Sequence, residues 1–183
     1  RYKPVDFRKG TEHGLEGTID WPISYEELAP FYDINDAEMG ISGVPGDPAY
    51  PARPNAPRDA TTRPGKLGLR MSEGFDKLGW HWWPSDNAII TQDRPGRQAC
   101  NECGGCLSGC PRGSLGGVHV AYWPTALRNG VDLRTSARVE KIEVESGRAT
   151  GAIYIDLVTG ERHRVTADVV VLSASGIGTP RLL

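Results

Sequence analysis

The chain has 183 residues, a formal net charge of −2 and 38% hydrophobic residues, a composition typical of globular proteins. It has no basic stripe, which argues against nucleic acid as a partner, and no apolar run approaches the ~20 residues of a membrane-spanning helix. The 23 glycines and 14 prolines indicate that much of the chain is loop. The sequence starts without Met and stops where a helix is beginning, so we expect a piece of a longer protein, whose localisation stays open.

The first half of the chain predicts two helices separated by a long loop. Ser24 and Glu27 form a capping box that predicts a helix over residues 25–39, with Gly40 as its stop and Pro30 as a point of kinking or splitting. Residues 42–64 are rich in Pro and Gly and predict an irregular surface excursion. A second, amphipathic helix is expected over residues 65–78, with its apolar face formed by Leu67, Met71, Phe75 and Leu78.

Three tryptophans follow the second predicted helix within four positions, at Trp80, Trp82 and Trp83. The favoured interpretation is that they pack a helix onto a sheet. The sharper hypothesis is that one of them lines a substrate or cofactor cavity.

All four cysteines of the chain lie in one run of eleven residues with the spacing C-x2-C-x2-C-x3-C followed by Pro. This spacing is that of bacterial ferredoxin iron–sulfur ligands. A zinc site, a disulfide and inert thiols are the alternatives. The candidate metal ligands are Cys100, Cys103, Cys106 and Cys110.

The last third of the chain predicts mostly β-structure. After a helix over residues 120–128 and a short strand over 131–135, three alternating segments predict a meander, at residues 138–144, 150–158 and 162–166. The continuous apolar run 168–173 predicts a strand buried in a parallel sheet. The glycine turn after it, with Thr179 as N-cap and Pro180 in the first turn, predicts a helix whose start could hold phosphate groups. The four histidines are scattered, and no catalytic acid or base is evident.

Several motifs in this order resemble the glucose–methanol–choline (GMC) family of FAD-dependent oxidoreductases, especially its bacterial sugar dehydrogenase and cholesterol oxidase-like branch. Besides the cysteine run, the motifs are W-P-I-S-Y-E-E-L-x-P-F-Y (residues 21–32), G-I-S-G (40–43), Y-x-P-x-A-L (122–127), A-R-V-x-x-I (137–142) and V-V-V-L-S-A-S-G-I-G-T-P-R-L-L (169–183).

The resemblance implies an α/β fold, α+β within this chain, that forms part of an FAD/NAD(P)-binding Rossmann-like domain. Residues 1–130 would be the helical and loop substrate-side region with the Cys-rich loop. Residues 131–183 would supply the β-meander and a buried strand of the FAD-binding domain. The dinucleotide fingerprint would precede Arg1, so we expect this segment alone to hold FAD weakly.

The resemblance also implies site residues and chemistry. Val139 matches a valine whose backbone amide and carbonyl meet the FAD adenine. Ser173, Ala174 and Ser175 match the strand end near the ribose and pyrophosphate, where family members more often carry Ala-Ala-Gly or Ala-Asn-Gly. The catalytic histidine is expected beyond Leu183.

The implied reaction is oxidation of an alcohol group of a sugar or polyol by hydride transfer to flavin. Some sugar dehydrogenases of this family carry an iron–sulfur cluster on a segment like the cysteine run, so the implied cofactors are FAD and a possible cluster. An electron-acceptor protein is a possible partner. The alternative function is an iron–sulfur electron-transfer or metal-binding module without catalysis of its own.

Overall fold

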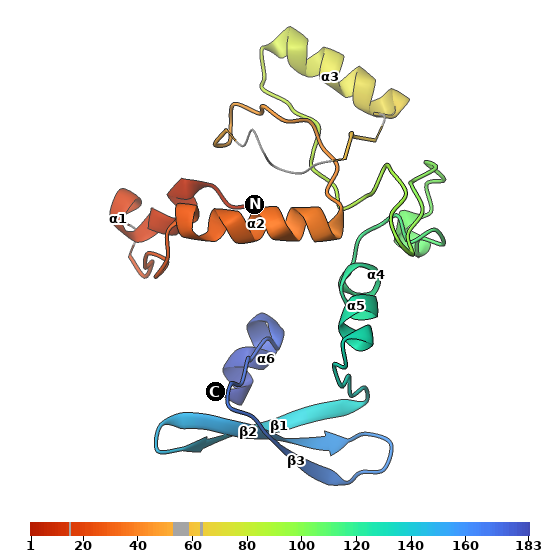
Figure 1. Ribbon diagram of the computed structural model, residues 1–183. Helices are drawn as coiled ribbons and strands as arrows, with labels where there is room; N and C mark the ends of the chain where they lie inside the picture. Colours follow the sequence, from red (N-terminus) through yellow and green to blue (C-terminus); the bar gives the residue numbers. More distant parts are fainter. Residues whose placement is uncertain (15, 53–58, 63) are drawn as a thin grey trace. The chain divides into compact units, whose positions relative to one another are not determined.

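The computed structural model describes residues 1–14, 16–52, 59–62 and 64–183. The chain divides into two compact units, Arg1–Gly130 and Val131–Leu183, which are described separately (Figure 1). The described residues include no helix that is both long and apolar enough to cross a membrane. The substrate-side and FAD-binding roles assigned to residues 1–130 and 131–183 stay predictions.

The N-terminal part of the first unit is organised by aromatic packing. After the short helices η1 (Pro4–Arg8) and α1 (Lys9–His13), the ring of Phe7, only 1% exposed, lies 4.9 Å from that of Trp21 and 6.0 Å from that of Tyr25. Tyr25 is the first residue of α2, so this cluster fixes where that helix begins.

The predicted capping box forms at the start of α2 (Tyr25–Met39). The amide of Glu27 donates to Ser24 Oγ (3.1 Å), and the amide of Ser24 donates to Glu27 Oε2 (2.7 Å). Gly40 ends the helix in the left-handed conformation, as predicted. The helix runs as one element through Pro30, so the predicted split does not occur. Pro30 cannot donate a backbone hydrogen bond, but this loss of helix stability does not outweigh the stability that the caps at both ends of α2 contribute.

The core of the first unit lies where the end of α2 meets residues 88–116. Ile90 is fully buried, and its amide donates to the carbonyl of Ser114 (3.1 Å) while its own carbonyl accepts from the amide of Cys100 (2.9 Å). Gly40 packs directly on Ile90, since a Cβ at Gly40 would meet Ile90 Cγ2 at 2.2 Å. The chain then continues through η2 (Cys106–Ser108), α4 (Val118–Ala121) and α5 (Trp123–Arg128), two short helices where one was predicted.

The second predicted helix is confirmed as α3 (Lys66–Leu78), ended by Gly79. Its apolar face is largely exposed, with Leu67 74% and Leu78 63% accessible. The ring of Trp80 stacks on that of Phe75 (6.0 Å), so this tryptophan packs beside its own helix. That the tryptophans pack a helix onto a sheet stays a prediction, because the described sheet belongs to the other unit. Of the predicted excursion 42–64, residues 53–58 and 63 lie outside the described residues, and the remainder contains no helix or extended strand.

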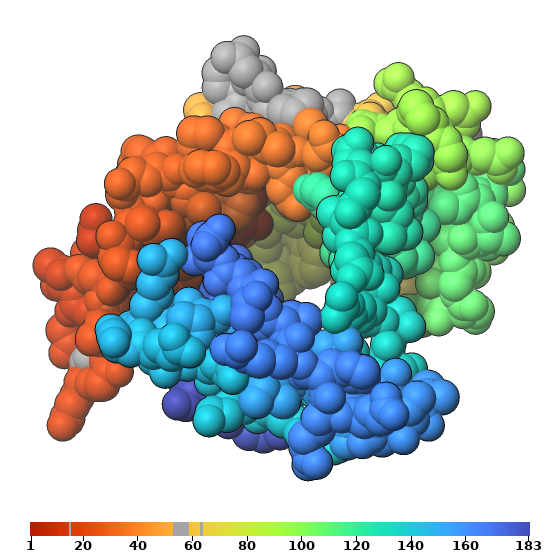
Figure 2. Space-filling view, turned by 60° about the horizontal axis from the view of Figure 1, so that its bottom comes forward, coloured from red at the N-terminus to blue at the C-terminus, as the bar shows by residue number. Residues whose placement is uncertain are grey.

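The second unit contains the predicted meander. Strands β1 (Ala137–Glu145), β2 (Arg148–Asp156) and β3 (Arg162–Thr166) pair antiparallel in sequence order. Figure 2 shows residues of this unit as the cyan to dark-blue surface. In the turn between β2 and β3, Val158 is 81% exposed. Gly151 allows β3 to approach β2, because a Cβ there would meet the carbonyl oxygen of Val165 at 2.2 Å.

Two strand predictions in this unit were wrong. Residues 131–135 are not a strand, and residues 168–173 pair with no described strand, leaving Val169 76% and Val171 81% exposed. A parallel strand needs neighbouring parallel strands, and the sheet described here is an antiparallel one built from β1, β2 and β3.

The final helix of this unit is α6 (Ser175–Leu182), which begins four residues before the predicted N-cap. Thr179 lies inside it, and its Oγ1 accepts from the amide of Ala174 (3.0 Å), so the N-cap prediction for Thr179 was wrong.

The contact between Gly40 and Ile90 can be tested by substitution. Gly40→Ala should lower the free energy of unfolding by about 2–4 kcal/mol, because the added methyl overlaps Ile90 and the left-handed backbone (φ 73°) disfavours a Cβ. Gly74→Ala, at an open position inside α3, should instead raise it by about 0.5–1 kcal/mol. Chemical denaturation of the purified protein measures both, and equal changes at the two positions would contradict the packing described.

Candidate functional site

The four cysteines line one cavity of about 350 Å³ in the first unit. Cys100 and Cys110 are half-buried, Cys103 and Cys106 are exposed, and all four are free thiols. Residues that are close in sequence thus line the same cavity. The cavity is also lined by Thr62, Gly65, Ile89, Asn101, Glu102, Gly104, Gly105, Arg112, Ser114 and Leu115.

The cysteine loop is held at its base by backbone pairing. The amide of Gln98 donates to the carbonyl of Arg112 (2.9 Å), and Arg112 Nε donates to the carbonyl of Ala99 (2.9 Å). Ser114 Oγ closes the base by donating to the carbonyl of Gln98 (2.6 Å). These contacts fix where the loop leaves and re-enters the unit.

The thiol of Cys110 is electrostatically distinct. Hydrogen bonds from the backbone amides of Leu115 and Arg112 stabilise the thiolate and lower the pKa of Cys110 to about 7, with Ser114 contributing as well. A thiol with this pKa is substantially ionised at neutral pH and therefore nucleophilic.

The fit of the thiols to a metal is poor in this arrangement. Nowhere in the described residues do three or more His, Cys, Asp or Glu side chains gather as metal ligands. The four sulfurs thus share a cavity without converging on one point, so the site as it stands does not fit a bound cluster. The assignment of Cys100, Cys103, Cys106 and Cys110 as metal ligands stays a prediction.

The residues predicted to contact flavin lie in the second unit. Val139 is half-buried on β1, opposite Tyr154, and β1 is an edge strand of the meander. The register shifts between Val139 and Lys141, so Glu140 forms a bulge beside Val139. An edge strand presents backbone N–H and C=O groups that another molecule can pair with, and bulges re-aim such groups. This geometry fits recognition of an adenine by backbone atoms of Val139.

Ser173, Ala174 and Ser175 lie at the junction into α6, and α6 contacts β1. Ser175 has φ of 66°, in the left-handed region that favours glycine. The resembling family more often carries Gly at this position, so the backbone conformation agrees with the family pattern although the residue differs. A tight turn at the start of a helix fits a phosphate-bearing cofactor. The contacts of Val139, Ser173, Ala174 and Ser175 with FAD stay predictions.

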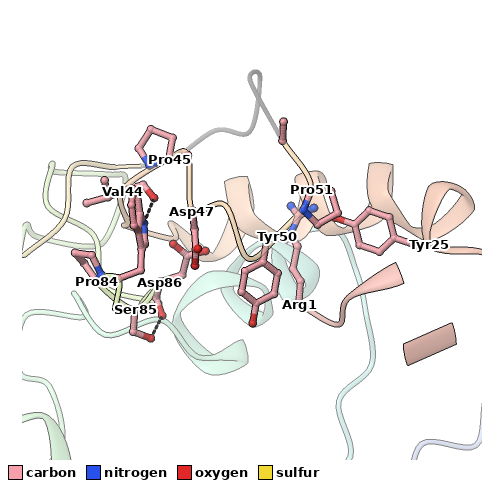
Figure 3. A pocket seen from close by; sticks show the side chains of 13 residues that line it. Arg1, Tyr25, Val44, Pro45, Asp47, Tyr50, Pro51, Pro84, Ser85 and Asp86 are labelled. Carbon is pink, nitrogen blue, oxygen red and sulfur yellow. Dashed lines mark hydrogen bonds between the residues drawn. The ribbon is translucent and has the colours of Figure 1, made fainter. Parts of the chain in front are cut away.

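A second cavity in the first unit, of about 400 Å³, has Trp83 in its wall. Figure 3 shows Asp47, Ser85 and Asp86 on one side of it and Arg1, Tyr50 and Tyr25 on the other. Trp83 therefore lines a cavity, whereas a substrate or cofactor in that cavity stays a prediction; its Nε1 donates to the carbonyl of Val44 (2.9 Å).

Sequence reasoning missed Arg1, Asp47 and Asp86 as members of this site. They lie far apart along the chain and follow no period, and only the neighbouring tryptophans signalled a cavity.

Residues 61–183 match the family described as GMC oxidoreductase. The whole chain is 64% identical to a 2-methyl-1,2-propanediol dehydrogenase of Mycolicibacterium austroafricanum, of which it covers 33%. It is 32% identical to the fructose dehydrogenase large subunit of Gluconobacter japonicus and 30% identical to a 6'''-hydroxyparomomycin C oxidase of Streptomyces lividus, each over the whole chain and 34% of the relative. The chain thus spans about a third of the length of the curated relatives it matches.

The thiolate at Cys110 predicts a pH profile for alkylation. Labelling of Cys110 by iodoacetamide, followed by mass spectrometry of the peptide, should have its midpoint near pH 7, because the folded backbone donates to this sulfur. Cys110→Ser should remove this low-pH phase, whereas Cys103→Ser should leave it. A midpoint for Cys110 in the ordinary range of a free thiol, about 8.5, would contradict the hydrogen bonding described.

Proposed function

Because the chain belongs to the GMC oxidoreductase family, which is FAD-dependent, we propose that it forms part of an enzyme that oxidises an alcohol group of a small polyol or sugar. The observation that carries this proposal is the family match over residues 61–183, together with 64% identity to a diol dehydrogenase. The flavin supplies the redox chemistry by accepting hydride.

We assign the flavin-binding role of this chain to the second unit. The edge of β1 at Val139 would meet the adenine through backbone N–H and C=O groups, which needs no particular side chain. The turn at Ser173–Ser175 would hold the ribose and pyrophosphate beside the start of α6. The resemblance implies a catalytic histidine that is expected beyond Leu183, so no proton transfer is assigned to the residues of this chain.

The proposed substrate class follows from the relatives' names. One relative is named for a 1,2-diol and another for fructose, and both compounds carry neighbouring hydroxyl groups. We therefore propose a vicinal diol or a sugar as the substrate of this protein. An electron-acceptor protein remains the proposed partner for reoxidation.

The second candidate function is an electron-transfer module on the cysteine run. The observation that favours it is that all four thiols line one cavity. No step of the proposed oxidation is assigned to a cluster, because the sulfurs do not converge in this arrangement. The family match supports the flavoenzyme over a carrier without catalysis.

One anaerobic experiment separates these functions. Addition of 1,2-propanediol or D-fructose to the purified full-length protein should bleach its visible flavin absorbance, because hydride transfer reduces the isoalloxazine. Iron and acid-labile sulfide are measured on the same sample. Stoichiometric iron and sulfide without flavin would overturn the proposal in favour of the carrier, whereas flavin with iron would add the cluster to the enzyme.

The flavin assignment predicts a difference between two strained serines. Ser175 and Ser146 both have positive φ, 66° and 51°, so valine should destabilise the protein at either position. Only Ser175→Val should also weaken FAD binding, by about tenfold or more (about 1.4 kcal/mol), because Ser146 lies in the β1–β2 turn. Fluorescence titration of the deflavinated protein with FAD measures the affinity, and equal losses at both positions would contradict the assignment.

A further inference from the structure

Two of the four thiols lie against the same stretch of backbone, at the end of the cysteine loop. The chain turns after Cys110, where the amide of Gly113 donates to the carbonyl of Cys110 (3.2 Å). Its sulfur accepts hydrogen bonds from the backbone amides of Leu115 and Arg112 and from Ser114. Ser114 is only 1% exposed, so the interior of the first unit positions this cysteine.

Cys100 reaches the same stretch from the other arm of the loop. Its amide donates to the carbonyl of Ile90 (2.9 Å), and the amide of Ile90 donates to the carbonyl of Ser114 (3.1 Å). The two preceding carbonyls, those of Gln98 and Ala99, accept hydrogen bonds from side chains of that stretch. Cys100 is therefore held beside the segment that binds the sulfur of the other half-buried cysteine.

The remaining two thiols lie at the tip of the loop. Cys103 and Cys106 are exposed, and the neighbouring Leu107 is fully accessible to solvent. All four thiols line the same cavity, but the hydrogen bonds at the base of the loop act on Cys100 and Cys110. The fold therefore brings one particular pair together out of the three pairings that four cysteines allow for each thiol.

Two neighbouring thiols are converted to a disulfide by a hydroperoxide in two steps. One thiolate attacks the peroxide oxygen, the O–O bond breaks, and a sulfenic acid and hydroxide or alkoxide are formed. The second thiol attacks the sulfenic sulfur, the S–S bond forms and water leaves. With hydrogen peroxide, two thiols lose two hydrogens in total and the peroxide becomes two molecules of water.

The order of attack does not change the product. The hydrogen bonds to the sulfur of Cys110 stabilise its thiolate, so we expect this sulfur to attack the peroxide first. If Cys100 attacks first, the same disulfide is formed. The pairing therefore depends on which sulfurs lie together, and not on which of them is ionised.

We propose that Cys100 and Cys110 are a modification site, at which a hydroperoxide forms a reversible disulfide that closes the cysteine loop at its base. The bond joins two positions that the fold already holds in place, so closing the loop costs little further chain entropy. A dithiol restores both thiols by exchange. This inference concerns the cysteine run alone and does not depend on the proposed oxidation of an alcohol.

The test locates the disulfide by peptide mass. The purified full-length protein is reduced with dithiothreitol, desalted anaerobically and treated with hydrogen peroxide, and the remaining thiols are alkylated. Trypsin leaves all four cysteines on one peptide, residues 98–112, which has no internal Lys or Arg. A second protease that cleaves after Glu102 then separates Cys100 from the other three cysteines. A disulfide to Cys100 is therefore detected as two linked peptides, and tandem mass spectrometry identifies its partner.

Two double variants serve as a matched pair. Cys103→Ser with Cys106→Ser keeps the proposed pair, whereas Cys100→Ser with Cys110→Ser keeps the pair at the tip. The unaltered protein and the first double variant should both lose two hydrogens per chain and yield the linked peptides. The second double variant should not lose these hydrogens under the same treatment. Dithiothreitol should restore the alkylation of both thiols.

Any other pairing in the unaltered protein, or none, would overturn the proposal. It would be overturned as well by a reduced protein whose thiols resist alkylation because bound iron or zinc holds them. If the first double variant loses its far-UV circular dichroism, the linked peptides of the unaltered protein decide the pairing. A disulfide of the predicted pairing in a protein that oxidises no alcohol would sustain this site and refute the proposed function.

Discussion

The first unit depends on one buried cation. Arg97 is 5% exposed and donates to three carbonyl oxygens: Nε to Gly113 (2.9 Å), Nη1 to Met39 (3.0 Å) and Nη2 to Ser114 (3.3 Å). Burial lowers the pKa of Arg97, but a guanidinium stays charged at neutral pH. Each bond from a charged donor contributes roughly 1.5–3 kcal/mol. Together they offset part of the cost of burying the charge and join the end of α2 to the exit of the cysteine loop.

The position of the cysteine cavity follows from the three hydrogen bonds that Arg97 donates. Because Arg97 fixes Gly113 and Ser114, the loop from Cys100 to Cys110 starts and ends at defined points, and its thiols face one cavity. The same chain path brings the backbone amides of Arg112 and Leu115 to the sulfur of Cys110. The low pKa of this thiol therefore arises from the fold itself, so reactivity at Cys110 and metal binding by the run are separate properties.

Short sequence motifs predicted the helices and strands that are stabilised by residues close to one another in the sequence. The capping box at Ser24 and the glycines at 40 and 79 marked the ends of α2 and α3, and alternation marked the three strands of the meander. The apolar run 168–173 misled because burial on both faces depends on partner strands, and the sheet of this chain offers none in parallel. Apolar pattern alone does not say what covers an element.

The polar contacts that organise both cavities could not have been predicted in this way. Arg97 reaches Met39 across 58 positions, and Arg1 reaches Asp33 and Asp36 across 32 and 35 positions. Such pairs leave no periodic trace in the sequence. The cysteine run was found because its ligand-like residues are close in sequence, whereas the Arg1 and Asp47 groups come together only through the fold.

Ser175 lies in the turn proposed to bind FAD, and its backbone conformation depends on contacts that other residues make. A left-handed residue with a Cβ costs about 1–2 kcal/mol relative to the right-handed form, yet Ser175 adopts φ of 66°. The turn is imposed from outside the residue, by the bond from the Ala174 amide to Thr179 Oγ1 and by the contact of α6 with β1. The surrounding structure therefore stabilises the strained turn before any ligand binds. A cofactor-binding loop requires a preformed turn of this kind. Because folding already orders the turn, the entropy lost on ordering it does not weaken the binding of FAD.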